Sequence, residues 1–344
     1  TGFKGSWLIS WLNLLGANVI GVSLDPPTEI SHFNVAKMTN DIKDLRIDIR
    51  DFSAIEKAIV EAQPDFVFHL AAQALVRSSY NSPIETWQTN VLGTLHILES
   101  LRKLDKPCVA VLITSDKCYD NVEWVWGYRE NDAMGGPDPY SASKGAAELV
   151  IRSHIKSFFS KGESRIRIAS ARAGNVIGGG DWATDRIVPD CVQAWSQQKT
   201  VLLRNPHSTR PWQHVLEPLG GYLTLAAALK ENPRLHGESF NFGPPSHQTQ
   251  SVLELVQQMS KHWDQVRWED VINDNSGPYE SGLLKLNCDK ALHYLKWQAT
   301  LNFEETVNLT ADWYKSYYEK PESIASVTRE QINKYVRLSK MSFN

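Results

Sequence analysis

The sequence predicts an α/β fold: a doubly wound parallel sheet covered by helices, with a smaller C-terminal domain interleaved with it. Two observations in the first half of the chain predict the sheet. Short runs that are apolar throughout alternate with helical patterns, which is typical of parallel strands buried on both faces. A glycine-containing turn also stands directly before the first helical pattern. In the second half, Trp-rich and Pro-rich segments interrupt this regularity and predict the smaller domain.

Each element follows from a local pattern. Apolar residues recur at helical spacing from Trp7 to Leu15, and Gly16 suits the C-cap of that helix. Ser53 and Glu56 predict a capping box at the start of the next helix. We expect strands at 18–25, 45–49, 65–72, 108–114, 165–171 and 239–244. We expect long helices at 83–104 and 140–159, and a strand end followed by a helix within 213–230.

The bulk composition excludes several classes of protein. The 344 residues carry a net charge of −3, which argues against a general nucleic-acid-binding or anionic-membrane surface. No apolar run approaches the roughly 20 residues of a membrane span, and no signal-peptide pattern is visible. The four cysteines have no C-x-x-C or zinc spacing, and no H-E-x-x-H occurs. We therefore expect no metal, no nucleic-acid or membrane partner, and buried thiols in a reducing cytoplasm.

The first turn, Thr1-Gly-Phe-Lys-Gly5, resembles part of a phosphate-binding motif. A dinucleotide-binding Rossmann-type fold has a strand before such a turn and three glycines across it. Only two of those glycines are present, and no Met precedes them. We infer that the sequence lacks its first strand and first motif glycine, and we expect Gly2, Phe3, Lys4 and Gly5 to contact the cofactor.

Asp25 ends the next expected strand, 20 residues after Gly5, where an acid accepts the hydroxyls of the adenosine ribose. Because a carboxylate there repels a 2′-phosphate, the sequence predicts NAD rather than NADP. The alternative is a helix-capping glycine and a turn aspartate. We expect a NAD-binding domain at 1–174, with returning segments near 211–243. The remaining segments, 175–210 and 244–344, would mainly form a substrate domain.

Tyr140 and Lys144 stand four residues apart at the start of an expected helix, so both project from one face. A neighbouring ammonium and a positive nicotinamide ring both favour the phenolate. This pair predicts a general base that takes a proton from a sugar hydroxyl. The alternative is an amphipathic helix with a solvated lysine, but a strand that ends in Thr114 and Ser115 precedes the pair.

With these motifs the chain resembles the extended short-chain dehydrogenase/reductase family over nearly its whole length. The stretches that carry the likeness are "HLAAQALVRSSYNSP" (69–83), "NVLGT" (90–94), "YSASK", "GNVIGGGDW" and "RPWQHV" (210–215). "GFKGSWL" and "TSDKCYDN" resemble the nucleotide-sugar dehydratase branch of the family. The resemblance implies NAD, a nucleotide-sugar substrate with CDP-glucose favoured, and a homodimer or homotetramer. It also implies supply of deoxysugars for bacterial surface polysaccharide.

The strand 108–114 leads directly into Ser115, Asp116 and Lys117. Strand ends at this edge of a doubly wound sheet point into the ligand crevice. By resemblance, Tyr140 and NAD would oxidise C4 of the sugar, with Ser115 on the C4 oxygen. Asp116 would protonate the departing C6 hydroxyl, and the hydride would return to C6.

The resemblance leaves the role of Lys117 open, because dTDP-sugar relatives have a glutamate there. A lysine is a base only if its pKa falls well below its ordinary value; otherwise Lys117 would stabilise the C4 enolate. Two other functions remain alternatives: an epimerase or reductase acting on a UDP-, GDP- or dTDP-hexose, and a NAD-binding protein without chemistry. The Asp116–Lys117 pair argues against the first alternative, and the complete Ser115, Tyr140 and Lys144 set argues against the second.

The resemblance also implies further binding residues. Asp48 would bind the adenine amino group, with Ile49 packed on the ring. Leu70, Ala71 and Ala72 would let the backbone approach the cofactor, and Asn90 would be structural. Asn175 and Arg210 would hold the diphosphate, Tyr279 and Glu280 would contact the nucleotide ribose, and Trp182 and Trp212 would stack on a ring or pack in the core.

Overall fold

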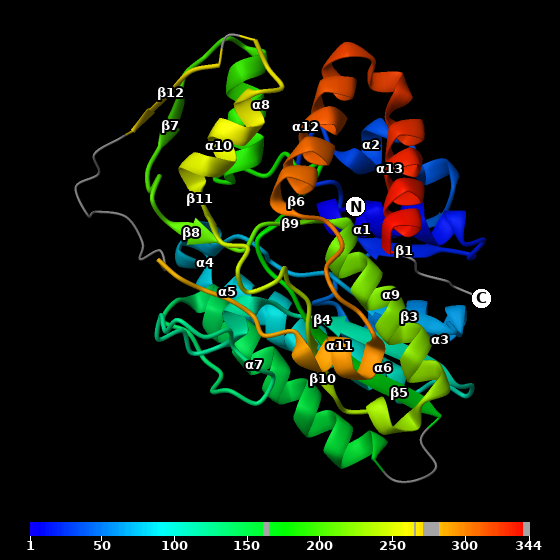
Figure 1. Ribbon diagram of the computed structural model, residues 1–344. Helices are drawn as coiled ribbons and strands as arrows, with labels where there is room; N and C mark the ends of the chain where they lie inside the picture. Colours follow the sequence, from blue (N-terminus) through cyan, green and yellow to red (C-terminus); the bar gives the residue numbers. More distant parts are fainter. Residues whose placement is uncertain (161–164, 265, 271–281, 340–344) are drawn as a thin grey trace.

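The structure is a computed structural model that describes residues 1–160, 165–264, 266–270 and 282–339. Its main sheet contains four parallel strands (Figure 1): β3 (Phe66–His69), β4 (Cys108–Ile113), β5 (Ile166–Arg172) and β10 (Ser239–Asn241). Their order is β10-β5-β4-β3. The predicted strands of the first half are thus present and parallel, and the α/β fold class is confirmed.

A second parallel pair, β1 (Ile20–Ser23) and β2 (Lys43–Arg46), lies apart from the main sheet. β1 and β3 each pair with only one other strand among the described residues, and both line the same large cavity. Within the described part of the chain, the doubly wound sheet is therefore divided into two parallel pieces. The strand expected at 45–49 is instead β2, which ends at Arg46.

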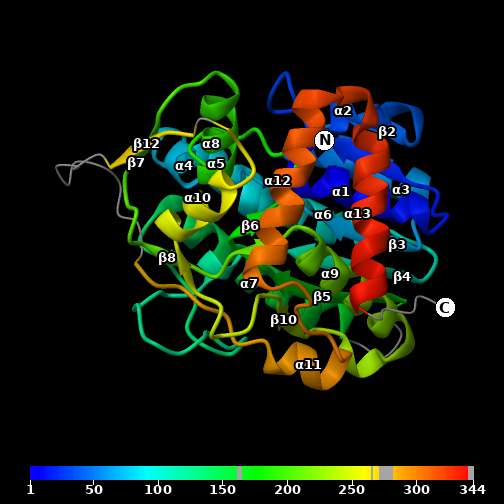
Figure 2. The same ribbon diagram turned by 45° about the horizontal axis from the view of Figure 1, so that its top comes forward.

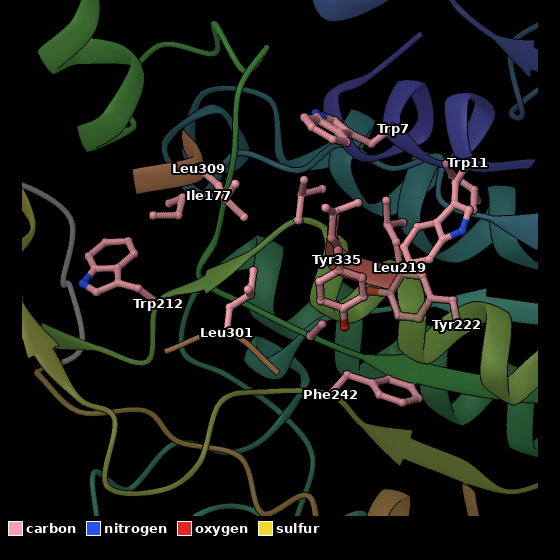
Figure 3. Packing of buried hydrophobic residues seen from close by; sticks show 14 of the residues in the cluster. Trp7, Trp11, Ile177, Trp212, Leu219, Tyr222, Phe242, Leu301, Leu309 and Tyr335 are labelled. Carbon is pink, nitrogen blue, oxygen red and sulfur yellow. The ribbon is translucent and has the colours of Figure 1, made fainter. Parts of the chain in front are cut away.

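Helices cover both faces of the main sheet because the side chains of β4 alternate between them. Cys108, Ala110 and Leu112 pack on one face against α3 (Phe52–Ala62), α6 (Gly93–Leu101) and α7 (Pro139–His154). Val109 and Val111 point to the other face, which α1 (Phe3–Leu14) and α9 (Leu216–Glu231) cover. Figure 3 shows the aromatic packing on this second face, including Trp11, Tyr222 and Tyr335.

The helix predicted at 83–104 is continuous but not uniform. It begins as α5 (Pro83–Trp87), passes through a π-helical turn at Gln88–Leu92 and ends as α6 at Leu101. The helix predicted at 140–159 likewise ends in a π-helical turn, Ile155–Phe159, after α7. Among the described residues, no helix combines the length and apolar character needed to cross a membrane.

The predicted Ser53–Glu56 capping box is wrong. α3 begins at Phe52, and Asp51 is its N-cap, accepting a hydrogen bond from the Ala54 backbone N–H. Ser53 therefore lies inside the helix, because the aspartate two residues earlier already satisfies the first turn. Capping boxes occur instead at α10 (Val252–Ser260) and α12 (Phe303–Glu319).

The second half contributes short paired strands around the carboxyl edge of the sheet. β6 (Val176–Ile177) pairs with β9 (Gln213–His214), β8 (Thr209–Arg210) with β11 (Gln250–Ser251), and β7 (Val201–Leu203) with β12 (Trp268–Asp270). The helices of this region are α8 (Ile187–Ser196), α10 and α11 (Asp289–Leu295).

The C-terminal helices α12 and α13 (Ile324–Ser339) lie side by side (Figure 2). They return to the first half of the chain, where α13 packs on α1 with Tyr335 edge-on to Trp11 at 5.7 Å between ring centres. Trp313 of α12 and Tyr335 of α13 share one hydrophobic core with Trp7 and Trp11 of α1. The proposed boundary that assigns 244–344 mainly to a substrate domain stays a prediction, since this end of the chain also supports the NAD-binding half.

Candidate active site

One cavity of 2140 Å³ runs the length of β3 and includes the carboxyl end of β4. Every described residue to which the sequence assigned a catalytic, cofactor-binding or diphosphate-binding role lines it. These residues are Gly2, Phe3, Lys4, Gly5, Asp25, Asp48, Ile49, Leu70, Ala71, Ala72, Ser115, Asp116, Lys117, Tyr140, Lys144, Asn175 and Arg210. Tyr279 and Glu280 lie outside the described residues. Residues from many parts of the sequence therefore meet in one space.

The glycine turn at one end of the cavity fits a diphosphate. α1 begins after Gly2, whose extended backbone forms the N-cap without any side-chain cap. A methyl group added at Gly2 or Gly5 would meet no described atom within 4 Å. Backbone N–H groups at a helix start bind anions, and this chain therefore has room and donors for the diphosphate of a dinucleotide.

Two predicted acids lie along the same end. Arg46 approaches the Asp25 carboxylate to 3.6 Å. Asp48 is bound more tightly, because the Arg50 guanidinium donates to both of its oxygens at 2.5 to 3.0 Å and holds its pKa below the ordinary value. Ile49 is buried over Gly93, where a methyl group would lie 2.5 Å from the Ile49 Cδ1 atom.

The loop after β3 is hydrogen-bonded through Asn90 to α7, the helix that carries Tyr140 and Lys144. The Asn90 side chain accepts from the Gln73 backbone N–H at 2.9 Å and donates to Ser143 Oγ at 2.9 Å. Ser143 in turn donates to the Tyr140 backbone carbonyl at 2.7 Å. The structure thus places Asn90 between the loop of Leu70–Ala72 and the first turn of α7, in agreement with a structural role.

The predicted catalytic residues Ser115, Asp116, Tyr140 and Lys144 lie where β4 ends, and we call this part of the cavity the catalytic corner. Ser115 Oγ donates to Asp116 Oδ1 at 3.0 Å and also contacts the Tyr140 side chain. Tyr140 lies in the first turn of α7, which Asp138 caps. Lys144 Nζ lies 6.0 Å from the centre of the Tyr140 ring. Asp116, Tyr140 and Lys144 are all buried, so this corner is screened from bulk water.

Burial governs the electrostatics of this corner. It raises the pKa of Tyr140 to about 12, although the hydrogen bond with Ser115 acts in the opposite direction. It also lowers the pKa of Lys144 to about 8 and that of Lys4 to about 8. The chain alone therefore keeps the phenol protonated, because a buried phenolate beside Asp116 is poorly solvated.

The Lys4 side chain extends from the glycine turn toward the charged groups around Asp116. Arg186, Asp116 and Lys144 all influence its pKa, so its ammonium lies among the charges of the catalytic corner. Arg186, which the sequence analysis missed, forms an ion pair of 2.6 Å with Asp181 and lines the cavity. An isolated arginine after a loop carries no pattern that would have marked it.

A buried ion pair supports the corner from behind. Arg172 of β5 donates to Glu148 of α7 at 2.8 Å, and Glu148 also accepts from Thr114, which directly precedes Ser115. Burial alone would raise the pKa of Glu148, but Arg172 holds it below the ordinary value. The pair therefore joins β4, β5 and the catalytic helix. The sequence analysis missed it, although an arginine within a buried strand was a usable signal.

The residues predicted to contact the substrate lie in different surroundings. Asn175 Nδ2 donates to Asp116 Oδ2 at 3.1 Å, so its side chain contacts the predicted catalytic acid. Arg210 donates to the Thr209 carbonyl at 2.8 Å on the cavity wall. Trp212 also lines the cavity, whereas Trp182 packs edge-on against Trp313 in the core. No cluster of three or more metal-binding side chains occurs within the described ranges.

Comparison with known proteins agrees with this geometry. The profile of the family described as GDP-mannose 4,6 dehydratase matches residues 1–310. The chain belongs to this family. It is 46% identical over 341 residues to a CDP-glucose 4,6-dehydratase of Salmonella typhimurium, a match that covers 98% of this chain and 94% of that protein. The predicted membership of the extended short-chain dehydrogenase/reductase family, dehydratase branch, is confirmed.

Solved structures of dehydratases and epimerases share the fold of this family member. One is dTDP-glucose 4,6-dehydratase from Bacillus anthracis in complex with NAD, with a TM-score of 0.74, 19% identity and coverage of 92% of this chain and 95% of that chain. Another is UDP-glucose 4-epimerase from Thermotoga maritima with UDP-glucose, with a TM-score of 0.76, 20% identity and coverage of 92% and 97%.

Proposed function

We propose that the protein is a NAD-dependent 4,6-dehydratase that converts CDP-glucose to CDP-4-dehydro-6-deoxyglucose and water. The observation that carries this proposal is the buried Asp116 carboxylate, which touches the same serine as the Tyr140 phenol. An epimerase needs only the tyrosine and its partners, whereas loss of the C6 hydroxyl needs an acid. The CDP-glucose 4,6-dehydratase that is 46% identical to this chain supports cytosine as the nucleotide base of the substrate.

The chain's own groups divide the proposed reaction between them. NAD, when bound, would supply the acceptor for the C4 hydride and the source of the hydride delivered to C6. Tyr140 takes the proton of the C4 hydroxyl as general base, and Ser115 holds the C4 oxygen by a hydrogen bond. The ammonium of the buried Lys144 beside the ring, together with the positive ring of bound nicotinamide, would favour the phenolate that accepts this proton.

The elimination uses the two residues that follow Ser115. Once C4 is a ketone, the proton on C5 is acidic. Asp116 donates a proton to the C6 hydroxyl, which departs as water, while the C5 proton is removed. Lys117 lines the cavity next to Asp116, and two roles stay open for it: removal of the C5 proton as a neutral amine, or stabilisation of the enolate as an ammonium ion.

The nucleotide end of the substrate would lie along the second half of the chain. Arg210 on β8 and Trp212 line the cavity together. A guanidinium matches the geometry of phosphate oxygens, so we assign Arg210 to the diphosphate of the substrate. The roles of Tyr279 and Glu280 on the nucleotide ribose stay predictions.

We further infer a homodimer or homotetramer. Ile84, Trp87 and Leu92 are exposed along α5 and the following turn, and Leu149 is exposed on α7, which packs against α5. Exposed apolar side chains on neighbouring helices favour contact with another subunit. Light scattering on the eluting protein that gives a pure monomer would remove this inference.

One assay tests the function and its alternatives together. The protein is incubated with NAD and, in parallel, with CDP-, UDP-, GDP- and dTDP-glucose. A 4-keto-6-deoxy sugar absorbs strongly in alkali, and we expect this signal from CDP-glucose. An epimerised sugar without loss of water would support an epimerase, and NAD binding without any turnover would support a protein that only binds the dinucleotide.

A further inference from the structure

The Asp116 carboxylate rests on the backbone that follows β5. Both of its oxygens are held: Oδ1 accepts from Ser115 Oγ at 3.0 Å, and Oδ2 accepts from Asn175 Nδ2 at 3.1 Å. Because the two donors come from different strand ends, they fix the plane of the carboxylate as well as its position. Asp116 is buried, so water does not compete strongly for these bonds.

Gly174 lies directly against the Asp116 carboxylate, and we refer to Gly174 and Asn175 together as the cradle of this carboxylate. A methyl group at position 174 would lie 2.0 Å from Asp116 Cγ and 2.0 to 2.1 Å from the two carboxylate oxygens. Such distances are far below ordinary van der Waals contact, near 3.5 Å or more for heavy atoms. The carboxylate therefore occupies the space where any other residue would carry its side chain, and even alanine at 174 would displace it.

The next residue adopts a backbone conformation that suits this contact. Asn175 has φ +53°, a left-handed conformation that asparagine tolerates better than most residues. This conformation accompanies an amide that faces Asp116 rather than one that continues the strand. A β-branched residue at 175 would find the backbone strained and would offer no amide donor.

Gln213 of β9 holds the cradle in place. Its side-chain Nε2 donates to the Gly174 carbonyl at 2.9 Å and to the Phe242 carbonyl at 3.0 Å. Its backbone N–H donates to the Asn175 carbonyl at 3.1 Å. Gln213 is itself buried. Gly174 and Asn175 are therefore both hydrogen-bonded to Gln213 of β9.

We propose that Gly174 and Asn175 are positioning residues for the elimination half of the reaction. They hold the Asp116 carboxyl where it reaches the C6 oxygen, and they take no part in oxidation at C4. In the step that they serve, the C5–H and C6–O bonds break and a C5–C6 double bond forms. The Asp116 proton leaves with the hydroxyl as water, and the base takes the C5 proton. This inference rests on the proposed dehydratase function.

The experiment compares Gly174→Ala and Asn175→Ala with the wild-type enzyme on CDP-glucose. C4 oxidation is read from the absorbance of reduced nicotinamide, and dehydration is read from the alkali-absorbing product. In Gly174→Ala we expect dehydration to fall by about 100-fold or more, while reduced nicotinamide forms and accumulates. In Asn175→Ala we expect a smaller fall of the same kind, because one of the two donors to the carboxylate remains.

Two further readouts separate positioning from a general structural defect. The C5 proton of the stalled 4-keto sugar should still exchange with deuterated water, because the base is untouched. If Asn175 served only the diphosphate, Asn175→Ala would raise KM for CDP-glucose without accumulation of reduced nicotinamide. A fall in the same proportion of C4 oxidation and dehydration, or wild-type dehydration in both variants, would overturn the proposal.

Gly243→Ala is the matched control. A methyl group at Gly243 would meet Leu286 at 3.5 Å and Cys288 Sγ at 3.6 Å, which are ordinary contacts, and we expect wild-type rates from it. If Gly174→Ala does not fold, Asn175→Ala alone decides the outcome. A wild-type enzyme that dehydrates none of the four nucleotide sugars overturns the proposed function itself. If the wild-type enzyme dehydrates CDP-glucose, but neither variant loses dehydration while keeping C4 oxidation, only the inference is overturned.

Discussion

At the catalytic end of the cavity, Asp116, Tyr140 and Lys144 are each more than nine-tenths buried, whereas at the cofactor end the Asp25 side chain is 91% exposed. The catalytic groups are bound to one another or backed by the Glu148–Arg172 pair. The charged neighbour of Asp25 is Arg46, at 3.6 Å. Burial shifts the pKa values of Tyr140 and Lys144, whereas the Asp25 carboxylate, which the sequence assigned to the ribose hydroxyls, stays in contact with water.

The contrast predicts the largest effect for Tyr140→Phe at the buried end. Loss of a general base costs about 10²- to 10⁴-fold in rate. We expect neither product nor reduced nicotinamide when CDP-glucose is added, while thermal stability stays close to wild type. Formation of reduced nicotinamide at the wild-type rate would show that another group removes the C4 proton.

Glu148→Gln tests how much the buried Glu148–Arg172 ion pair contributes to the stability of the fold. Removing one partner of a buried pair leaves Arg172 uncompensated and should cost about 3–5 kcal/mol in the free energy of unfolding, measured with urea. Glu99→Gln is the control, because Glu99 is only partly buried in its pair with Arg102. We expect Glu99→Gln to cost less than about 1 kcal/mol in the free energy of unfolding. Equal losses of stability in the two variants would contradict the expected difference between buried and partly exposed ion pairs.

Glu217 extends the comparison to a buried carboxyl outside the cavity. Its oxygens accept from the Leu301 backbone N–H at 2.6 Å and from the Tyr335 hydroxyl at 2.8 Å. Burial raises the pKa of Glu217 to about 7 from an ordinary 4.5. Because the folded-state pKa is the higher one, its contribution to stability is complete below about pH 4.5 and is lost as pH rises through 7.

The corresponding variant is Glu217→Gln, whose amide keeps an acceptor for the backbone and a donor for Tyr335. The wild-type protein should lose about 3 kcal/mol between pH 4.5 and 8 through this group, because a tenfold difference in proton affinity between the folded and unfolded states is equivalent to about 1.4 kcal/mol. We expect the urea-unfolding free energy of the variant to vary less over that range. Parallel pH profiles for the two proteins would show that Glu217 does not titrate there.

The smallest effect belongs to the exposed end. Asp25→Asn should leave the free energy of unfolding within about 0.5 kcal/mol of wild type, as for most surface substitutions. It should weaken NAD binding by about tenfold, equivalent to one hydrogen bond of about 1.4 kcal/mol. Calorimetric titration with NAD measures this change, and an unchanged affinity would remove Asp25 from the cofactor site.

Much of this arrangement was accessible from local sequence patterns. Strand periodicity predicted β4 and β5, and the spacing of Tyr140 and Lys144 predicted two side chains on one helical face. The position of Asp116 at the end of an apolar run predicted its place at the carboxyl edge of the sheet. The predicted capping box at Ser53 is wrong because Asp51, two residues earlier, caps the helix instead. A short sequence motif does not indicate which of two neighbouring candidates will be the N-cap.

By itself, the sequence determined the parallel α/β architecture, the helix that carries Tyr140 and Lys144, and the strand that leads into Ser115, Asp116 and Lys117, because periodicity and chain order are local properties. Only the tertiary structure decided that Gly174 underlies the acid, that Asn175 binds it and that Glu148 pairs with Arg172. The reason is physical: these contacts join separate strand ends and helices, and their strength depends on the burial that packing creates.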